Sequence, residues 1–123
     1  MKEPDLLVTN VTRGMILADS LDVADTFLKS LVGLIGRSSL GKGNGLWIKP
    51  CQSVHTFWMR FPIDVLFLDQ KGVVVHFIEY MRPFRISKHV RKARSVLELP
   101  AMSIRDSKTQ AGDFIEFTHV QGA

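Results

Sequence analysis

The chain has 123 residues, of which 46% are hydrophobic and 23% are charged, and its formal net charge is +4. This composition is that of a globular domain and excludes a disordered or fibrous chain. One cysteine excludes an internal disulfide, and no apolar run approaches the roughly 18 residues that cross a bilayer. Because the start also lacks a secretory signal pattern, we expect one soluble, cytoplasmic domain over residues 1–123 without a membrane partner.

The first part of the chain predicts two or three strands and one helix. Residues 6–11 and 15–18 are rich in β-forming side chains and flank the turn Thr12-Arg13-Gly14, which predicts a hairpin. Residues 21–25 alternate between apolar and polar and either extend the second strand or begin a third. Residues 25–36 predict a short helix, because apolar side chains recur there at helical spacing after a capping residue.

The centre of the chain predicts a second hairpin. Residues 46–49 predict a short strand that Pro50 ends. Residues 63–68 are continuously apolar, which predicts a strand covered on both faces. The segment Asp69–Gly72 predicts a four-residue turn with glycine at the position that accepts positive φ, and residues 73–79 predict the returning strand.

The last part of the chain predicts a basic loop, two strands and one helical turn. The loop spans residues 82–94 and carries six lysines and arginines with no acidic residue. Residues 96–99 and 114–118 predict strands, and residues 102–107 predict one helical turn. Together the elements predict a mainly β (α+β) fold, a compact sandwich or barrel of about seven or eight short strands with one or two short helices.

The segment after Pro50 holds the only cysteine, followed at a spacing of four by His55. A nucleophile and its base need contact at about 3 Å, whereas four residues of extended chain separate two side chains by about 13 Å. A buried structural thiol is therefore the default for Cys51, and catalysis by this pair remains an alternative. A lone Cys-x3-His spacing does not predict a metal site, and we expect neither a metal nor a cofactor.

The residues after His55 predict an extended segment whose two faces differ. In an extended run Trp58 and Arg60 share one face, while Phe57 lies on the core-filling face. Arg60 and Asp64 are four positions apart, so an extended chain places both side chains on the same face. Their structural explanation is an ion pair or a carboxylate that accepts backbone N–H bonds, and the functional explanation is an arginine that holds a planar anion beside the tryptophan.

Four segments resemble a known family in matching order. They are Gly33-Leu34-Ile35-Gly36-Arg37, Cys51 with His55 to Asp69, Val96 to Pro100, and Gly112-Asp113. Together they are similar to domain-of-unknown-function family 192, over roughly residues 15 to 118. The resemblance implies a compact, mainly β domain of sandwich or jelly-roll-like shape with one or two helices. It implies no activity, substrate, cofactor or catalytic residue.

The leading hypothesis is a non-enzymatic binding module for a small anionic or polar ligand, because polar groups beside apolar walls are typical of pockets. The candidate ligand-binding residues are His55, Trp58, Arg60, Asp64, Arg82 and Arg85. The first alternative is a small hydrolytic enzyme that uses Cys51 and His55. The second is a nucleic-acid-associated protein that uses residues 82–94, although a stacking platform has little support because that loop contains a single aromatic residue, Phe84.

Overall fold

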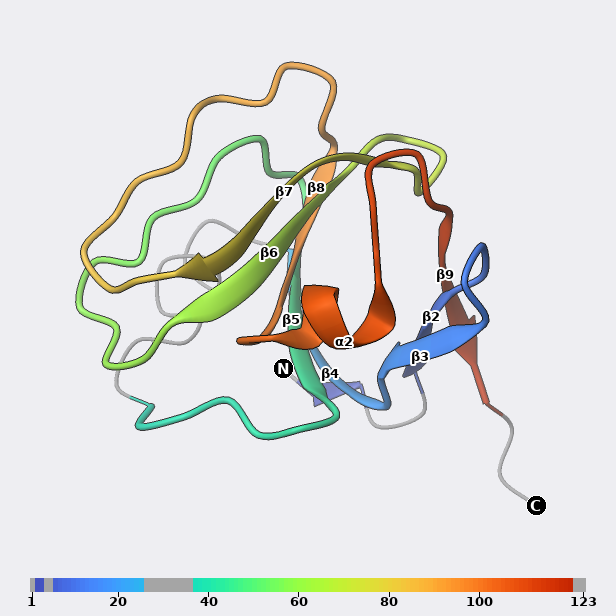
Figure 1. Cartoon of the computed structure of the whole chain (residues 1–123), viewed down its shortest axis with the longest axis horizontal. Coiled ribbons are helices and arrows are strands. Elements are labelled where there is room, and N and C mark those ends of the chain that lie inside the picture. The colour runs from blue at the N-terminus through green and yellow to red at the C-terminus, as the bar shows by residue number, and fades with distance from the viewer. Residues whose placement is uncertain (1, 4–5, 26–36, 121–123) are drawn as a thin grey trace.

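The computed structural model describes residues 2–3, 6–25 and 37–120 (Figure 1). Apart from Asp25, the helix predicted over residues 25–36 lies outside the described residues. The described chain is mainly β and forms two sheets with one short helix, which confirms the predicted fold class. Neither sheet closes on itself, so the arrangement is a sandwich and not a barrel.

The larger sheet has the strand order β1-β4-β5-β8-β6-β7, and the smaller sheet has the order β3-β2-β9. The bounds of the elements are β1 Lys2–Glu3, β2 Leu6–Asn10, β3 Met15–Ala18, β4 Ser20–Ala24, β5 Asn44–Ile48, β6 Ile63–Leu68, β7 Val74–Met81, β8 Ser95–Pro100, α2 Ser103–Ser107 and β9 Ile115–His119. The helical turn predicted over residues 102–107 is therefore α2. All neighbouring strands run antiparallel except β4 and β5, which are parallel.

Both predicted hairpins are present. Strand β2 pairs with β3, and β6 pairs with β7. The second turn is closed by Asp69, whose side chain accepts the N–H groups of Lys71 and Val73, each at 2.9 Å. Gly72 has a φ of 90°, a conformation that costs glycine little because it has no Cβ.

The two faces of the larger sheet have different covers. One face packs against the smaller sheet and α2, and this cluster includes Leu66, Leu97 and Ile104. The opposite face packs against irregular segments. Its cluster joins Val65 and Val96 of the sheet to apolar side chains from two long loops: Val54, Met59, Val90 and Ala93. All six residues of β6 are buried, which confirms the prediction that both faces of this strand are covered.

Two loops on this second face carry the predicted site residues. We call residues 49–62, between β5 and β6, the Trp58 loop, and residues 82–94, between β7 and β8, the basic loop. Each crosses from one end of the larger sheet to the other over this face, and the two lie side by side (Figure 1). No helix in the described part of the chain is long and apolar enough to cross a membrane.

Candidate ligand-binding surface

The Trp58 loop and the basic loop run antiparallel and are joined along their backbones. The N–H of Cys51 donates to the carbonyl of Arg94 at 3.0 Å, and the N–H of Val90 donates to the carbonyl of Gln52 at 2.8 Å. Further along, the N–H of Ser87 donates to Val54 at 2.8 Å. The prediction of a surface loop at residues 82–94 is therefore correct, but the loop is hydrogen-bonded along its length.

Thr56 joins the two loops near their tip. Its N–H donates to the carbonyl of Arg85 at 2.9 Å, and its carbonyl accepts the N–H of Phe84 at 3.0 Å. Its hydroxyl donates to the carbonyl of Arg82 at 2.6 Å and accepts the N–H of Arg85 at 2.9 Å. Because Thr56 is fully buried, these bonds are shielded from water and fix the relative position of the two loops.

Four rings meet at this tip, and we call His55, Phe57, Trp58 and Phe84 the tip cluster. The ring centroids of His55 and Phe57 lie 5.0 Å apart and are stacked. The Phe84 ring lies 6.5 Å from Phe57 and 5.6 Å from Trp58, meeting the indole edge to face. Trp58 is 69% exposed and Phe84 is 54% exposed. The cluster therefore forms a connected aromatic surface in contact with solvent, drawn from both loops.

Two of these exposed rings stand on a strained backbone. The φ angle is 69° at Trp58 and 60° at Phe84, in the left-handed region that bulky residues avoid because their Cβ approaches the carbonyl oxygen. Each such residue costs on the order of 1 kcal/mol or more. The bonds to Thr56 hold both turns, since the N–H groups of Met59 and Phe84 both donate to its carbonyl. The chain therefore keeps strained conformations that present rings to solvent.

Three arginines lie close to residues of the tip cluster in the sequence, and all three are exposed. Arg60 follows Trp58 by two residues, and Arg82 and Arg85 flank Phe84. None of the three forms an ion pair with another described residue. The Arg82 guanidinium lies 5.9 Å from the ring of Tyr80. The surface beside the rings therefore carries positive charge that the described protein residues leave uncompensated.

Cys51 and His55 take separate hydrogen bonds. The Cys51 thiol donates to the carbonyl of Ser53 at 3.0 Å, and His55 Nδ1 accepts the N–H of Phe57 at 3.3 Å. Burial raises the pKa of the Cys51 thiol, and the nearby Glu98 carboxyl adds to this rise. A raised pKa disfavours the thiolate that a cysteine nucleophile requires. The neutral thiol of Cys51 is therefore favoured, and no hydrogen bond joins it to His55.

Asp64 lies apart from the exposed surface. It is fully buried, and its two carboxylate oxygens accept the N–H groups of Tyr80 and Ile104, each at 2.8 Å. The carboxylate thereby ties the end of β7 to the beginning of α2. This matches the structural explanation for Asp64, a carboxylate that accepts backbone N–H bonds, and leaves the other five candidate ligand-binding residues at or near the tip.

A second buried carboxyl lies under the two loops. Glu98 on β8 is paired across the sheet with Leu46 and Val65, and both neighbours belong to the core cluster on the loop-covered face. Burial raises the pKa of Glu98 to about 8. No described residue forms a hydrogen bond to its side chain, so the protonated form is favoured in the fold at neutral pH.

Sequence reasoning missed two parts of the exposed surface. Phe57 was predicted to face the core, yet it is 38% exposed. The turn at Trp58 breaks the alternation on which that prediction depended. Phe84 is a lone aromatic residue in the sequence of its own loop, and its ring neighbours Phe57 and Trp58 come from the other loop. The described residues contain no group of three or more His, Cys, Asp or Glu side chains placed to hold a metal ion.

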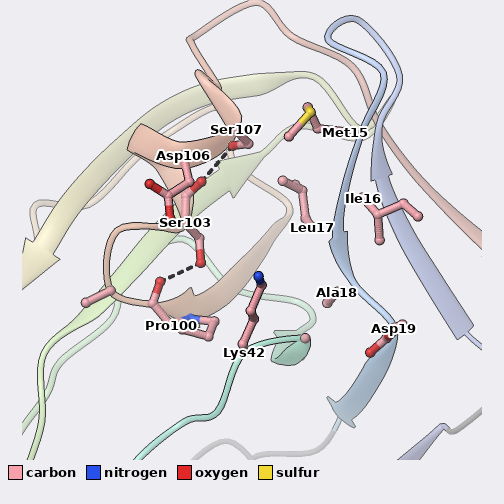
Figure 2. A pocket seen from close by; sticks show the side chains of 12 residues that line it. Met15, Ile16, Leu17, Ala18, Asp19, Lys42, Pro100, Ser103, Asp106 and Ser107 are labelled. Atoms are coloured by element: carbon pink, nitrogen blue, oxygen red, sulfur yellow. Dashed lines mark hydrogen bonds between the residues drawn. The ribbon is translucent and has the colours of Figure 1, made fainter.

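A cavity outside the two loops was also missed. It measures about 790 Å³ and lies between β3, α2 and the segment at Lys42 (Figure 2). Its polar lining comes from three segments that are well separated in the sequence, and none carries a recognisable motif.

Comparison with known proteins places this fold in a family. A family model described as an uncharacterized ACR, domain-of-unknown-function family 192, matches residues 8–117. The chain belongs to this family. The resemblance noted from the sequence is thereby confirmed.

Archaeal UPF0127 proteins are among the relatives of this chain. A UPF0127 protein from Thermococcus gammatolerans is 32% identical over 116 residues, which covers 90% of this chain and 74% of that protein. A UPF0127 protein from Pyrococcus furiosus is 29% identical, with coverage of 90% of this chain and 97% of that protein.

Two bacterial crystal structures share the fold. A protein of unknown function from Novosphingobium aromaticivorans has a TM-score of 0.78 and 19% identity, and the match covers 90% of this chain and 82% of that one. A proposed transcription regulator from Sinorhizobium meliloti has a TM-score of 0.79 and 21% identity, with coverage of 95% and 94%. At these identities the likeness concerns the fold alone.

Proposed function

We propose that this protein is a non-enzymatic binding module that holds an anionic ligand at the tip cluster and its three arginines. The observation that carries the proposal is the connected set of exposed rings beside cations that form no ion pair with a described residue. Contiguous apolar groups on a surface are typical of interaction sites. Guanidinium groups bind carboxylates and phosphates in a bidentate manner.

The arrangement of rings and charges defines the chemistry of the ligand. Trp58 and Phe84 offer ring faces and edges to a planar or apolar group. Arg60, Arg82 and Arg85 supply donors for an anionic group. A ligand that combines both parts, such as a nucleotide or an aromatic carboxylate, uses the whole surface.

Tryptophan emission provides the test. Trp47 is partly buried and stacks on Phe117 with a centroid distance of 3.8 Å, whereas Trp58 is the more exposed indole. We expect adenosine monophosphate and benzoate to change Trp58 emission with saturation, and Trp58→Phe to abolish the change. Arg60→Ala should weaken binding about tenfold, the loss of one charge-assisted contact.

Arg105→Ala is the matched control, because Arg105 is an exposed arginine on α2. Its affinity should equal that of the wild type. Saturable binding that Arg60→Ala leaves unchanged, or the absence of binding for both probes, would contradict the proposal.

Single-stranded nucleic acid is the second candidate ligand, and a specific observation favours it. The basic loop continues from the tip cluster, and its six cations are all exposed: Arg82, Arg85, Lys88, Arg91, Lys92 and Arg94. Nucleic-acid surfaces of this kind combine a line of cations with rings on which bases stack. The rings that the basic loop itself lacks are supplied by the Trp58 loop.

A thymidine oligonucleotide separates this candidate from a small ligand. Binding along the basic loop should weaken steeply with salt, because each neutralised phosphate releases counterions. The double variant Arg91→Ala/Lys92→Ala should weaken binding of the oligonucleotide and leave binding of adenosine monophosphate unchanged. Oligonucleotide binding that is independent of salt, or insensitive to this variant, would rule out the extended interface.

A further inference from the structure

The cavity between β3 and α2 is independent of the proposed binding surface. None of its lining residues belongs to the Trp58 loop or the basic loop. Its volume of about 790 Å³ falls within the range of about 300–1,000 Å³ that is typical of small-ligand sites. It is therefore large enough for a ligand of its own.

The position of β3 shows how a ligand can lie in this cavity. Five successive residues, Met15 to Asp19, line it. Successive side chains of a strand point to opposite faces, so a cavity lined by all of them meets the strand along its edge. Strand β3 is an edge strand of the smaller sheet. No backbone hydrogen bond beyond the sheet links residues 15–18 to another described segment.

Such an edge presents backbone donors and acceptors to an extended chain. Peptides bind other proteins by adding a strand at an edge of this kind, with side-chain pockets supplying the selectivity. Here the adjacent walls are apolar at Leu17 and Pro100, and Ile16 is exposed beside them.

The cavity also carries charges of both signs. Lys42 extends its ammonium between β3 and α2, and Asp106 projects from α2 (Figure 2). Asp19 lies at the end of β3. No ion pair joins these three side chains to one another or to other described residues. The lining is therefore complementary to a ligand that carries one carboxylate and one ammonium group.

We propose that this cavity binds a short apolar peptide, which lies along the free edge of β3 with its carboxylate at Lys42 and its ammonium at Asp106 or Asp19. The peptide backbone extends the smaller sheet by one strand. Its apolar side chains lie against Leu17 and Pro100. A folded protein segment is too large for this volume, and the end of a longer chain carries only one of the two charged termini, so the ligand is a free peptide.

The tripeptide Ala-Leu-Ala is the probe, titrated into the full chain while backbone amide resonances are recorded by NMR. The amides of residues 15–19 and 103–107 should shift, and those of the two loops should not. Amidation of the peptide's carboxylate should weaken binding about tenfold, as should acetylation of its ammonium. Methylation of the central peptide nitrogen should weaken binding too, because it removes a donor that pairs with the strand edge.

Two protein variants complete the test. Lys42→Ala should weaken binding of the free tripeptide about tenfold. It should leave binding of the amidated tripeptide unchanged, because that peptide has no carboxylate to contact Lys42. Lys71→Ala, at an exposed lysine in the β6–β7 turn, should behave as the wild type. Absence of binding at millimolar peptide, equal binding of the free and blocked peptides, or amide shifts confined to the tip cluster would each overturn the proposal.

Discussion

The two covers of the larger sheet achieve burial by different means. On one face, the smaller sheet and α2 supply apolar side chains from regular elements. On the other, two irregular loops supply Val54, Met59, Val90 and Ala93. Regular strands satisfy their backbones within a sheet, whereas the loops satisfy theirs by pairing with each other. An irregular cover can bury one set of side chains and still present another, the tip cluster, to solvent.

The largest expected effect is the pH dependence of stability that comes from Glu98, which is buried beneath the two loops. Burial raises the pKa of Glu98 from 4.5 to about 8, so the folded state keeps a proton that the unfolded state loses. The contribution of Glu98 to the free energy of unfolding is largest below the pKa of this group in the unfolded chain. It falls as the pH rises toward about 8. The total loss is about 5 kcal/mol. Urea unfolding of the wild type should show this decline.

Glu98→Gln should remove that decline, because the amide does not ionise. At about pH 8 the variant should be the more stable protein by several kcal/mol. Glu116→Gln, at an exposed glutamate of β9, is the control and should keep the slope of the wild type. Equal pH slopes for wild type and Glu98→Gln would show that the loops do not seal this face from water.

The next effect concerns the carboxylate that ties the end of β7 to the beginning of α2. Asp64→Ala leaves the part-buried N–H of Tyr80 and the buried N–H of Ile104 without an acceptor. We expect a loss of at least about 3 kcal/mol in the free energy of unfolding, measured in urea. Asp106→Ala, at an exposed aspartate, should cost little. A loss below about 1 kcal/mol at Asp64 would mean that the end of β7 and the beginning of α2 are held independently.

A smaller effect tests the joint between the two loops. Thr56→Val keeps the side-chain shape and removes the hydroxyl bonds to Arg82 and Arg85. We expect a loss of about 2 kcal/mol together with weaker binding at the tip cluster. Thr118→Val provides the same chemical change on β9 and should be nearly neutral. Weakened stability with unchanged ligand affinity would separate the cover from the binding surface.

The smallest effect on stability concerns the strained tryptophan. Glycine adopts the φ of 69° at position 58 without penalty, so Trp58→Gly should be about 1 kcal/mol more stable than Trp58→Ala in thermal unfolding. Both variants should lose the ligand bound at the tip. If the alanine and glycine variants are equally stable, the strain at this position has been relieved elsewhere.

Much of the fold is predictable from the sequence because its strands follow local rules. The alternating and continuous apolar runs identify both hairpins, and the Asp69–Gly72 turn has the residues that its geometry needs. The long loops follow no such rule. Their shape depends on bonds such as that between Val90 and Gln52, which join positions far apart in the sequence and have no local signature.

The same local rules explain which site residues were placed correctly from the sequence and which were not. Trp58 and Arg60 were correctly placed on the solvent side by alternation. Phe57 was misplaced because that alternation ends at the turn, and Asp64 lies in the core because β6 is covered on both faces. The cavity at Lys42 lies beyond sequence reasoning, since only the packing of β3 against α2 brings its lining together.

The central claim is that the two loops form one ordered layer that presents the tip cluster. Hydrogen exchange of individual amides tests it most directly. The N–H groups of Thr56, Phe84, Ser87 and Val90 donate across the two loops, and they should exchange far more slowly than the N–H of Lys92, which makes no such bond. Exchange of these four amides as fast as that of Lys92 would contradict the account.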